Sequence, residues 1–329
     1  MKQLGLRKVV LLCGIAVLFV VYVLQLALTG RQKMQELSFA EEPDSLLIQI
    51  GTDVSQTVAI AKEDGAWLVG DKKYPAAEST VDSLIAAIKE IKLLGQASGR
   101  TDDAERYGLH EAGRVLVTAS KDGKVLRTLS VGKDTSTKSQ SYVQVDGKPQ
   151  IYLAGGALHA TFATSVAAVR SKAVYSFDAS TLTAVSVSTV GTDSSLEGNF
   201  RIRKEEQAAA ETEEGVSVAA PVWHLDAETE EPVELDESKV SSWLSSLSSL
   251  NVDSWLDDAS ARAPEIVLDL EAGGKTYTVS LYASYAEAGE DGEAEKQYTA
   301  SCSETPYYFT LPSYVLPRFQ KKLSDLKKD

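Results

Sequence analysis

Two segments of the chain carry apolar residues at the spacing of an α-helix with one buried face. In both, the apolar positions stand at offsets 0, 3, 4, 7 and 10 from the first. They are Val81, Leu84, Ile85, Ile88 and Ile91 in one segment, and Val240, Trp243, Leu244, Leu247 and Leu250 in the other. This spacing predicts two amphipathic helices. Ser79 and Ser238 precede them as predicted N-caps, and Asp82 completes a capping box with Ser79.

Alternating apolar and polar residues predict antiparallel strands after each helix. After the first helix, the first pair of strands is predicted at residues 115–120 and 125–131, around Asp122-Gly123. After the second helix, the corresponding pair is predicted at residues 266–270 and 277–282, around Gly273-Gly274. Turns of this kind between alternating runs indicate β-hairpins. A second pair follows in each half, at residues 141–145 and 150–154, and at residues 297–301 and 307–311. Because one face of each sheet is apolar, we expect helices to cover that face.

The same landmarks recur at one interval, which indicates an internal duplication. Matching aromatic residues stand 156 or 157 positions apart: Tyr142 and Tyr298, and Phe162 and Phe319. Each phenylalanine belongs to a short closing helix. We therefore predict an α+β fold with two tandem copies of an antiparallel-sheet-plus-helices unit, at residues 45–178 and 179–329.

An apolar stretch precedes the first copy. Residues 9–28 contain no charged side chain and one polar side chain, Gln25. A helix of this length spans about 30 Å, the thickness of the hydrocarbon core of a bilayer. A cleaved signal peptide is the competing interpretation, but its apolar region usually runs only about 7–15 residues. We predict a transmembrane helix here, followed by a juxtamembrane linker over residues 29–44.

Basic residues give the predicted orientation of this helix. Lys2, Arg7 and Lys8 stand in the short N-terminal segment, residues 1–8, where there is no acidic residue. Lysine and arginine are enriched on the cytoplasmic side of membrane helices. We therefore predict a single-pass protein of the cytoplasmic membrane whose N-terminus lies inside, whose bulk is extracytoplasmic, and whose residues 9–28 contact the lipid bilayer.

Composition and charge exclude several classes of function. The formal net charge of −14 argues against a nucleic-acid partner, because such a surface repels phosphate backbones. The two cysteines, Cys13 and Cys302, cannot form a disulfide scaffold or a multi-cysteine metal site. Only three histidines are present. We accordingly predict no catalytic residues, no cofactor and no metal site.

Two motifs resemble catalytic signatures but have a simpler structural explanation. Gly274-Lys275-Thr276 ends like a phosphate-binding loop, yet position 269 is Asp where that loop needs glycine, and the triplet lies between two strands. Ser130 and Lys133 have the spacing of a serine acyl-enzyme, which needs the pair on a helical turn, whereas they stand at a strand end. We interpret both as strand and turn residues.

Other polar and aromatic features are also interpreted as structural. The acidic segments 205–215 and 286–295 are predicted to be solvated loop insertions, although their carboxylates could bind Ca²⁺ weakly. The serines between the apolar positions of the second helix are predicted to form its solvated face. Structural roles are also assigned to the remaining candidates: His110, His159, His224, Trp67 and Trp223.

Several segments of the first copy carry a family resemblance. They are WLVGDKKYPA at residues 67–76, VDSLIAAIK at 81–89, ERYGL at 105–109, and RSKAVYSFD at 170–178. In these segments the chain resembles the bacterial family known as domain of unknown function 4340. The resemblance implies an envelope protein anchored by a membrane helix or a lipid, often encoded beside the permease and ATPase of an ABC-type transporter. It implies no catalytic residues.

Together these observations predict a non-enzymatic, membrane-anchored extracytoplasmic accessory or interaction subunit. Its expected partners are an ABC-type permease and ATPase or other envelope proteins. One alternative is a ligand-binding module with its site between the two copies. Another is an envelope hydrolase that uses a carboxylate pair, because two acids need only be neighbours in space. A pocket or a close pair of carboxylates would favour these alternatives.

Overall fold

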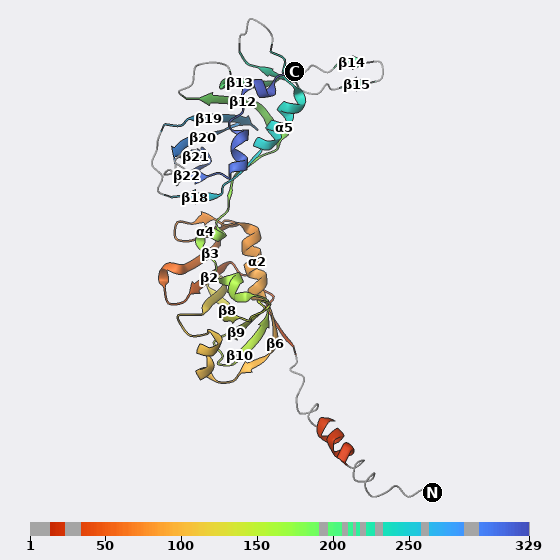
Figure 1. Cartoon of the computed structure of the whole chain (residues 1–329), viewed down its shortest axis with the longest axis vertical. Helices are drawn as coiled ribbons and strands as arrows, with labels where there is room; N and C mark the ends of the chain where they lie inside the picture. The colour runs from red at the N-terminus through yellow and green to blue at the C-terminus, as the bar shows by residue number, and fades with distance from the viewer. Residues whose placement is uncertain are drawn as a thin grey trace, which may run out of the picture. The chain divides into compact units, whose positions relative to one another are not determined.

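The structure is a computed structural model that falls into two compact units, Met1–Ser171 and Lys172–Asp329 (Figure 1). The described residues are 14–23, 34–190, 197–205, 210–212, 215–217, 222–227, 233–257, 263–285 and 296–328. Residues 14–23 are helical and solvent-exposed. The rest of the predicted membrane span, residues 9–13 and 24–28, lies outside the described residues. Within the described part of the chain, no helix has the length and apolar character needed to cross a membrane.

Unit 1 is built on a ten-stranded antiparallel sheet with the order β1-β6-β10-β9-β8-β7-β2-β3-β4-β5. The strands are β1 Gln35–Ser38, β2 Ser45–Ile50, β3 Thr57–Glu63, β4 Ala66–Val69, β5 Tyr74–Pro75, β6 Glu90–Ser98, β7 Val115–Lys121, β8 Lys124–Asp134, β9 Gln140–Val145 and β10 Ile151–Gly155. The helices are α2 Glu78–Lys89, α3 Leu158–Phe162 and α4 Val166–Val169, with 3₁₀ turns η1 Val54–Gln56, η2 Thr101–Asp103 and η3 Glu105–Tyr107. Helix α2 buries its apolar face and packs on β6, β7 and α3.

Unit 2 contains an eight-stranded antiparallel sheet with the order β16-β13-β12-β19-β20-β21-β22-β18. The strands of this sheet are β12 Leu182–Thr189, β13 Asn199–Glu205, β16 Val222–Leu225, β18 Ser254–Leu256, β19 Ile266–Ala272, β20 Lys275–Tyr285, β21 Lys296–Cys302 and β22 Thr305–Thr310. Two further pairs of strands form small separate sheets: β11 Ala173–Ser176 with β17 Ser249–Asn251, and β14 Ala210–Thr212 with β15 Gly215–Ser217. The helical elements are α5 Glu237–Leu247 and the 3₁₀ segments η4 Ala179–Thr181, η5 Ser313–Arg318 and η6 Leu323–Leu326. The α+β class and the antiparallel sheets are as predicted.

The strand order of unit 2 has a counterpart in unit 1. The unit 1 order β6-β10-β9-β8-β7-β2-β3-β4 corresponds, place by place, to β18-β22-β21-β20-β19-β12-β13-β16. The main helix precedes the counterpart strands β6 and β18 in both units. This agreement concerns topology alone, and common descent of the two units stays a prediction.

Both predicted hairpins form around turns with a left-handed backbone. Asp122 and Gly123 have φ values of 49° and 75°, and Gly273 and Gly274 have 57° and 79°. Positive φ at both central residues is the requirement of a type I′ turn, whose twist matches that of the flanking strands. This requirement explains why these dipeptides predicted the hairpins β7–β8 and β19–β20 correctly.

The ends of the two main helices differ from the prediction. Ile91 and Leu250 are buried, but they lie on strands β6 and β17, because the buried face continues directly from helix into strand. The predicted N-caps are wrong as well. Asp236 caps α5 by accepting hydrogen bonds from the backbone N–H groups of Ser238 and Lys239. The cap position of α2 is Ala77, which has no side-chain acceptor.

The boundary between the units also differs from the predicted one after Asp178. Strand β11 pairs with β17, and Tyr175 is buried in the core of unit 2, so the division falls before residue 172.

The predicted linker, residues 29–44, contains strand β1, which is paired along its length with β6. Strands β13 and β16 pair with each other on either side of the predicted loop insertion at residues 205–215, where the short strand β14 pairs with β15. The other acidic segment, residues 286–295, lies outside the described residues.

Candidate functional site

The two motifs that resemble catalytic signatures lie on strands and turns, as predicted. Lys275 begins β20 directly after the turn at Gly273-Gly274, and its ammonium pairs with the Glu304 carboxylate. A phosphate-binding loop would lead into a helix instead. Ser130 and Lys133 both lie within the extended strand β8. They therefore lack the helical turn that brings a serine and a lysine three residues apart together.

The histidines and cysteines do not converge. His110 precedes β7, His159 lies on α3, and His224 on β16 has its Nε2 3.3 Å from the Glu205 carboxylate. Among the residues that the structure describes, no three His, Cys, Asp or Glu side chains gather as a metal site would require. Cys302 is a free thiol whose pKa is raised by burial. Cys13 lies outside the described residues.

The two tryptophans of the predicted repeat occupy corresponding strands. Trp67 is buried on β4, and Trp223 is half-buried on β16, where it packs against the core of unit 2. β4 and β16 hold corresponding places in the two sheets. Both side chains therefore pack as structural residues.

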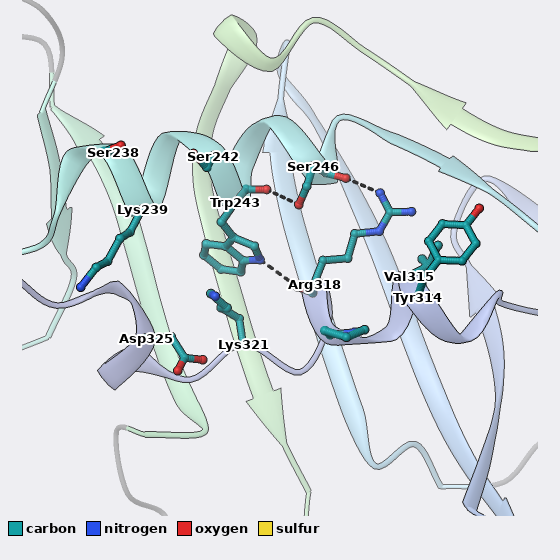
Figure 2. A pocket seen from close by; sticks show the side chains of 11 residues that line it. Ser238, Lys239, Ser242, Trp243, Ser246, Tyr314, Val315, Arg318, Lys321 and Asp325 are labelled. Carbon is teal, nitrogen blue, oxygen red and sulfur yellow. Dashed lines mark hydrogen bonds between the residues drawn. The ribbon is translucent and has the colours of Figure 1, made fainter.

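A groove of about 670 Å³ lies in unit 2, between α5 and the C-terminal segment that contains η5 and η6 (Figure 2). It is lined by Ser238, Lys239, Ser242, Trp243, Ser246, Tyr314, Val315, Pro317, Arg318, Lys321 and Asp325. Lys239 and Asp325 lie at one end of the groove in Figure 2, Trp243 and Lys321 in the middle, and Arg318 and Tyr314 at the other end.

The floor of the groove is formed by Trp243. Its side chain is only 4% exposed, and its ring lies 6.0 Å from that of Phe200 in the core. The indole Nε1–H donates to the backbone oxygen of Arg318 over 2.8 Å. A buried indole needs such an acceptor. The bond ties η5 to α5, so it holds the two walls of the groove together.

Arg318 closes one end of the groove and also binds the end of α5. Its Nη1 donates to the backbone oxygen of Ser246 and, over 3.4 Å, to that of Ser249. The Ser246 carbonyl lies in the last turn of α5 and has no partner within the helix, so a cation is favourable there, whereas Ser249 follows on β17. Arg318 Nε is buried and has no hydrogen-bond partner among the described residues. Desolvation lowers the pKa of the guanidinium.

The charge of the groove is opposite to that of the whole chain. Three of its lining side chains are cationic, Lys239, Arg318 and Lys321, and Asp325 is the acidic one. Lys239 Nζ donates to the Lys327 backbone oxygen over 3.1 Å. Because the chain carries a net charge of −14, this is a local positive site on an acidic protein. It would attract an anion.

A smaller pocket of about 300 Å³ adjoins the groove at Lys321 and contains two carboxylates, Glu197 and Glu265. The Glu197 carboxylate accepts a hydrogen bond from the Ser324 backbone N–H over 3.1 Å, and hydrogen bonding to Ser324 lowers its pKa. The Tyr298 hydroxyl donates to Glu265 over 3.3 Å. Glu197 therefore holds the C-terminal segment in place.

Sequence analysis missed the groove because its walls come from segments far apart in the chain. Ser238, Ser242 and Ser246 stand four residues apart on one face of α5; Ser238 was predicted to be the N-cap, and Ser242 and Ser246 were predicted to belong to a solvated face. The one available signal was the unequal composition of the two main helices. A serine-rich helix that also carries a tryptophan can indicate a face covered in part by another segment.

Fold and groove together define a class of protein: two antiparallel α+β units, the second of which has an open cationic groove. The chain belongs to the family described as domain of unknown function (DUF4340), which it matches over residues 67–268. The match begins in β4 and ends in β19, so it includes parts of both units and stops before residues 313–325. No curated protein and no solved structure matches the chain.

Proposed function

We propose that this chain is a membrane-anchored, extracytoplasmic accessory and interaction subunit of an ABC-type transport or envelope complex, without a catalytic role of its own. Residues 9–28 would cross the cytoplasmic membrane, with residues 1–8 inside. The observation that carries the proposal is strand β1, which joins the segment after the predicted span to the sheet of unit 1.

The length of the connecting chain limits how far unit 1 can lie from the bilayer. The predicted span ends at Leu28 and β1 begins at Gln35, which leaves residues 29–34 between them. A chain extends by at most about 3.6 Å per residue, so these residues reach roughly 20 Å in any conformation. Unit 1 would therefore lie close to the membrane surface, where it could contact the extracytoplasmic loops of a permease.

Strand β1 is held by more than its pairing with β6. Arg127, which is only 7% exposed, donates from Nη1 to the Leu37 backbone oxygen over 3.2 Å and to the Ile88 backbone oxygen over 3.4 Å. Its guanidinium also lies 5.1 Å from the ring centroid of Phe39. The strand that would follow the proposed anchor is thus part of the unit 1 fold, which suits a subunit that must hold a defined position on a membrane complex.

The proposal includes a duplication that gave rise to two copies, residues 45–178 and 179–329. The corresponding strand orders of the two sheets support it, because independent evolution of eight strands in one order is an improbable route to this topology. Two similar units would offer two related surfaces to the components of one complex. The groove lies wholly within unit 2, so it supports ligand binding by that unit and not the predicted alternative of a site between the two copies.

Crosslinking in intact membranes tests the proposed function. The full chain is expected to resist extraction by alkaline carbonate, and mild detergent should then recover it with a permease or ATPase in a constant ratio, as measured by mass spectrometry. The control lacks residues 1–33 but keeps β1. It should be soluble and should lose the partner. Recovery of the full chain alone, or its release by carbonate, would contradict the proposal.

A further inference from the structure

We propose that the groove between α5 and the C-terminal segment of unit 2 binds an acidic, extended peptide segment of a partner protein. This inference does not depend on the membrane anchor, because every residue that carries it belongs to unit 2. The family model matches residues 67–268 and stops before the C-terminal wall of the groove. The inference is therefore made for this chain and not for the family.

Charge complementarity identifies the chemistry of the ligand. The groove contains three cationic side chains and one carboxylate, within a chain of net charge −14. An anion that approaches this protein is repelled by most of the surface and attracted at this site. Nucleic acid is a poor occupant, because its long, uniformly charged backbone would extend over the acidic surroundings. A short acidic segment avoids that repulsion.

The shape of the groove distinguishes a peptide from a small anion. Ser238 and Ser246 mark its two ends on α5, and eight residues of helix rise about 12 Å. An extended peptide advances about 3.3 Å per residue, so three or four residues would fill this length. The cations follow the same direction in Figure 2, with Lys239 at one end, Lys321 in the middle and Arg318 at the other. A single phosphate ion could contact only part of this row.

Individual side chains have unused capacity to bind such a segment. Within the described residues the ammonium of Lys321 forms no ion pair, and the guanidinium of Arg318 is partly exposed at the end of the groove while its Nη1 binds backbone oxygens. A carboxylate could pair with each of these cations. Tyr314 is 83% exposed at the end of the groove, which is unusual for a large ring. It could cover an apolar or aromatic side chain that follows the acidic residues.

Fluorescence polarisation on the full-length protein in neutral phosphatidylcholine nanodiscs tests this inference. The probe is a fluorescein-labelled octapeptide of glutamates with one central phenylalanine, and the control probe has lysine in place of glutamate. We expect saturable binding of the acidic probe alone. Lys321→Glu should weaken it about tenfold or more, which corresponds to roughly 1.4 kcal/mol, and Tyr314→Ala should weaken it severalfold.

Lys322→Glu is the matched control, because it makes the same charge change at the next residue, which lines the smaller pocket and is absent from the groove. It should retain most of the binding. Equal losses in the two lysine variants, or no binding by the wild-type protein, would overturn the inference. Displacement of the probe by inorganic phosphate at low millimolar concentration would also overturn it, since the site would then bind a small anion.

Discussion

In each unit an arginine from outside the main helix binds a backbone oxygen at the C-terminal end of that helix. Arg127 on β8 binds the Ile88 oxygen of α2, and Arg318 at the end of η5 binds the Ser246 oxygen of α5. Burial lowers the pKa of both guanidiniums. Both also leave a buried Nε without a partner among the described residues. The two arginines therefore meet the same requirement, which is to place a cation at unpaired helix carbonyls.

The second contact of each arginine differs. Arg127 also donates to the Leu37 oxygen of β1 and is almost fully buried, whereas Arg318 also donates to the Ser249 oxygen of β17 and is partly exposed beside the groove. One helix end is thus coupled to the strand that leads to the predicted anchor, and the other to the candidate binding surface. The comparison shows that two units with one strand order connect the end of the main helix to different parts of the structure.

The prediction with the largest expected effect on stability concerns the buried faces of α2 and α5. Ile88 and Leu247 are the fourth apolar positions of the two helices, seven residues after the first, and both are 0% exposed. Replacing either by alanine should lower the free energy of unfolding of its own unit by about 2–5 kcal/mol, through lost burial and a residual cavity. Urea unfolding followed by hydrogen exchange and mass spectrometry would assign each loss to a unit.

Exposed positions on the same helices supply the controls for this test. Asp82→Ala in α2 and Ser245→Ala in α5 change solvent-exposed side chains and should leave unfolding nearly unchanged. A loss in unit 2 without a comparable loss in unit 1 would show that the two helices do not support their sheets equally.

Replacing the two arginines should give the next largest effect. Arg127→Leu and Arg318→Leu each leave backbone oxygens without a donor, at a cost of about 1–3 kcal/mol in the unit concerned. The exchange pattern should differ. Amides of residues 35–38 should exchange faster in the first variant only, and those of residues 246–251 in the second only. Lysine at either position should restore part of the stability, because it keeps a cationic donor. Faster exchange of β1 in both variants would contradict the separate roles of the arginines.

Much of this fold could be predicted because the signals are local. Four of the five apolar positions in each predicted helix are buried on α2 and α5, and the dipeptides at the turns have the left-handed backbone that they permit. The remaining apolar positions, Ile91 and Leu250, lie on strands. A buried face that runs from a helix straight into a strand keeps its hydrophobic pattern while the backbone conformation changes.

The groove and the two arginines could not be predicted, because their contacts join distant segments. Arg127 binds a residue 90 positions away, and Arg318 binds one 72 positions away. No periodicity in either segment records such a pairing. Asp236 is a different case, because its capping role is local. It was missed since Ser238, itself a good capping residue, stands two positions later, and the sequence alone does not decide between them.

A smaller effect on stability is expected when the N-cap residues of α2 and α5 are exchanged. Ala77 and Asp236 have nearly the same extended backbone, with φ and ψ of −73° and 111° and of −81° and 111°, but only Asp236 accepts hydrogen bonds with its side chain. Ala77→Asp should therefore raise the melting temperature of unit 1 by a few degrees, and Asp236→Ala should lower that of unit 2 by a similar amount, since the cap satisfies free N–H groups. An unchanged unit 1 would mean that its half-buried cap position cannot accommodate a carboxylate.

The pH dependence separates the charge of Asp236 from its geometry. The hydrogen bond from the Lys239 backbone N–H is the main cause that lowers the pKa of Asp236 in the folded protein, and Ser238 adds to it. A carboxyl whose pKa is lower in the folded state stabilises the protein above its unfolded pKa, and this contribution is lost as the pH falls through the folded value. Asp236→Asn keeps an acceptor without the titration. The melting temperature of unit 2 should thus fall less between pH 7 and pH 3 in Asp236→Asn than in the wild-type protein, and equal falls would assign the cap to geometry alone.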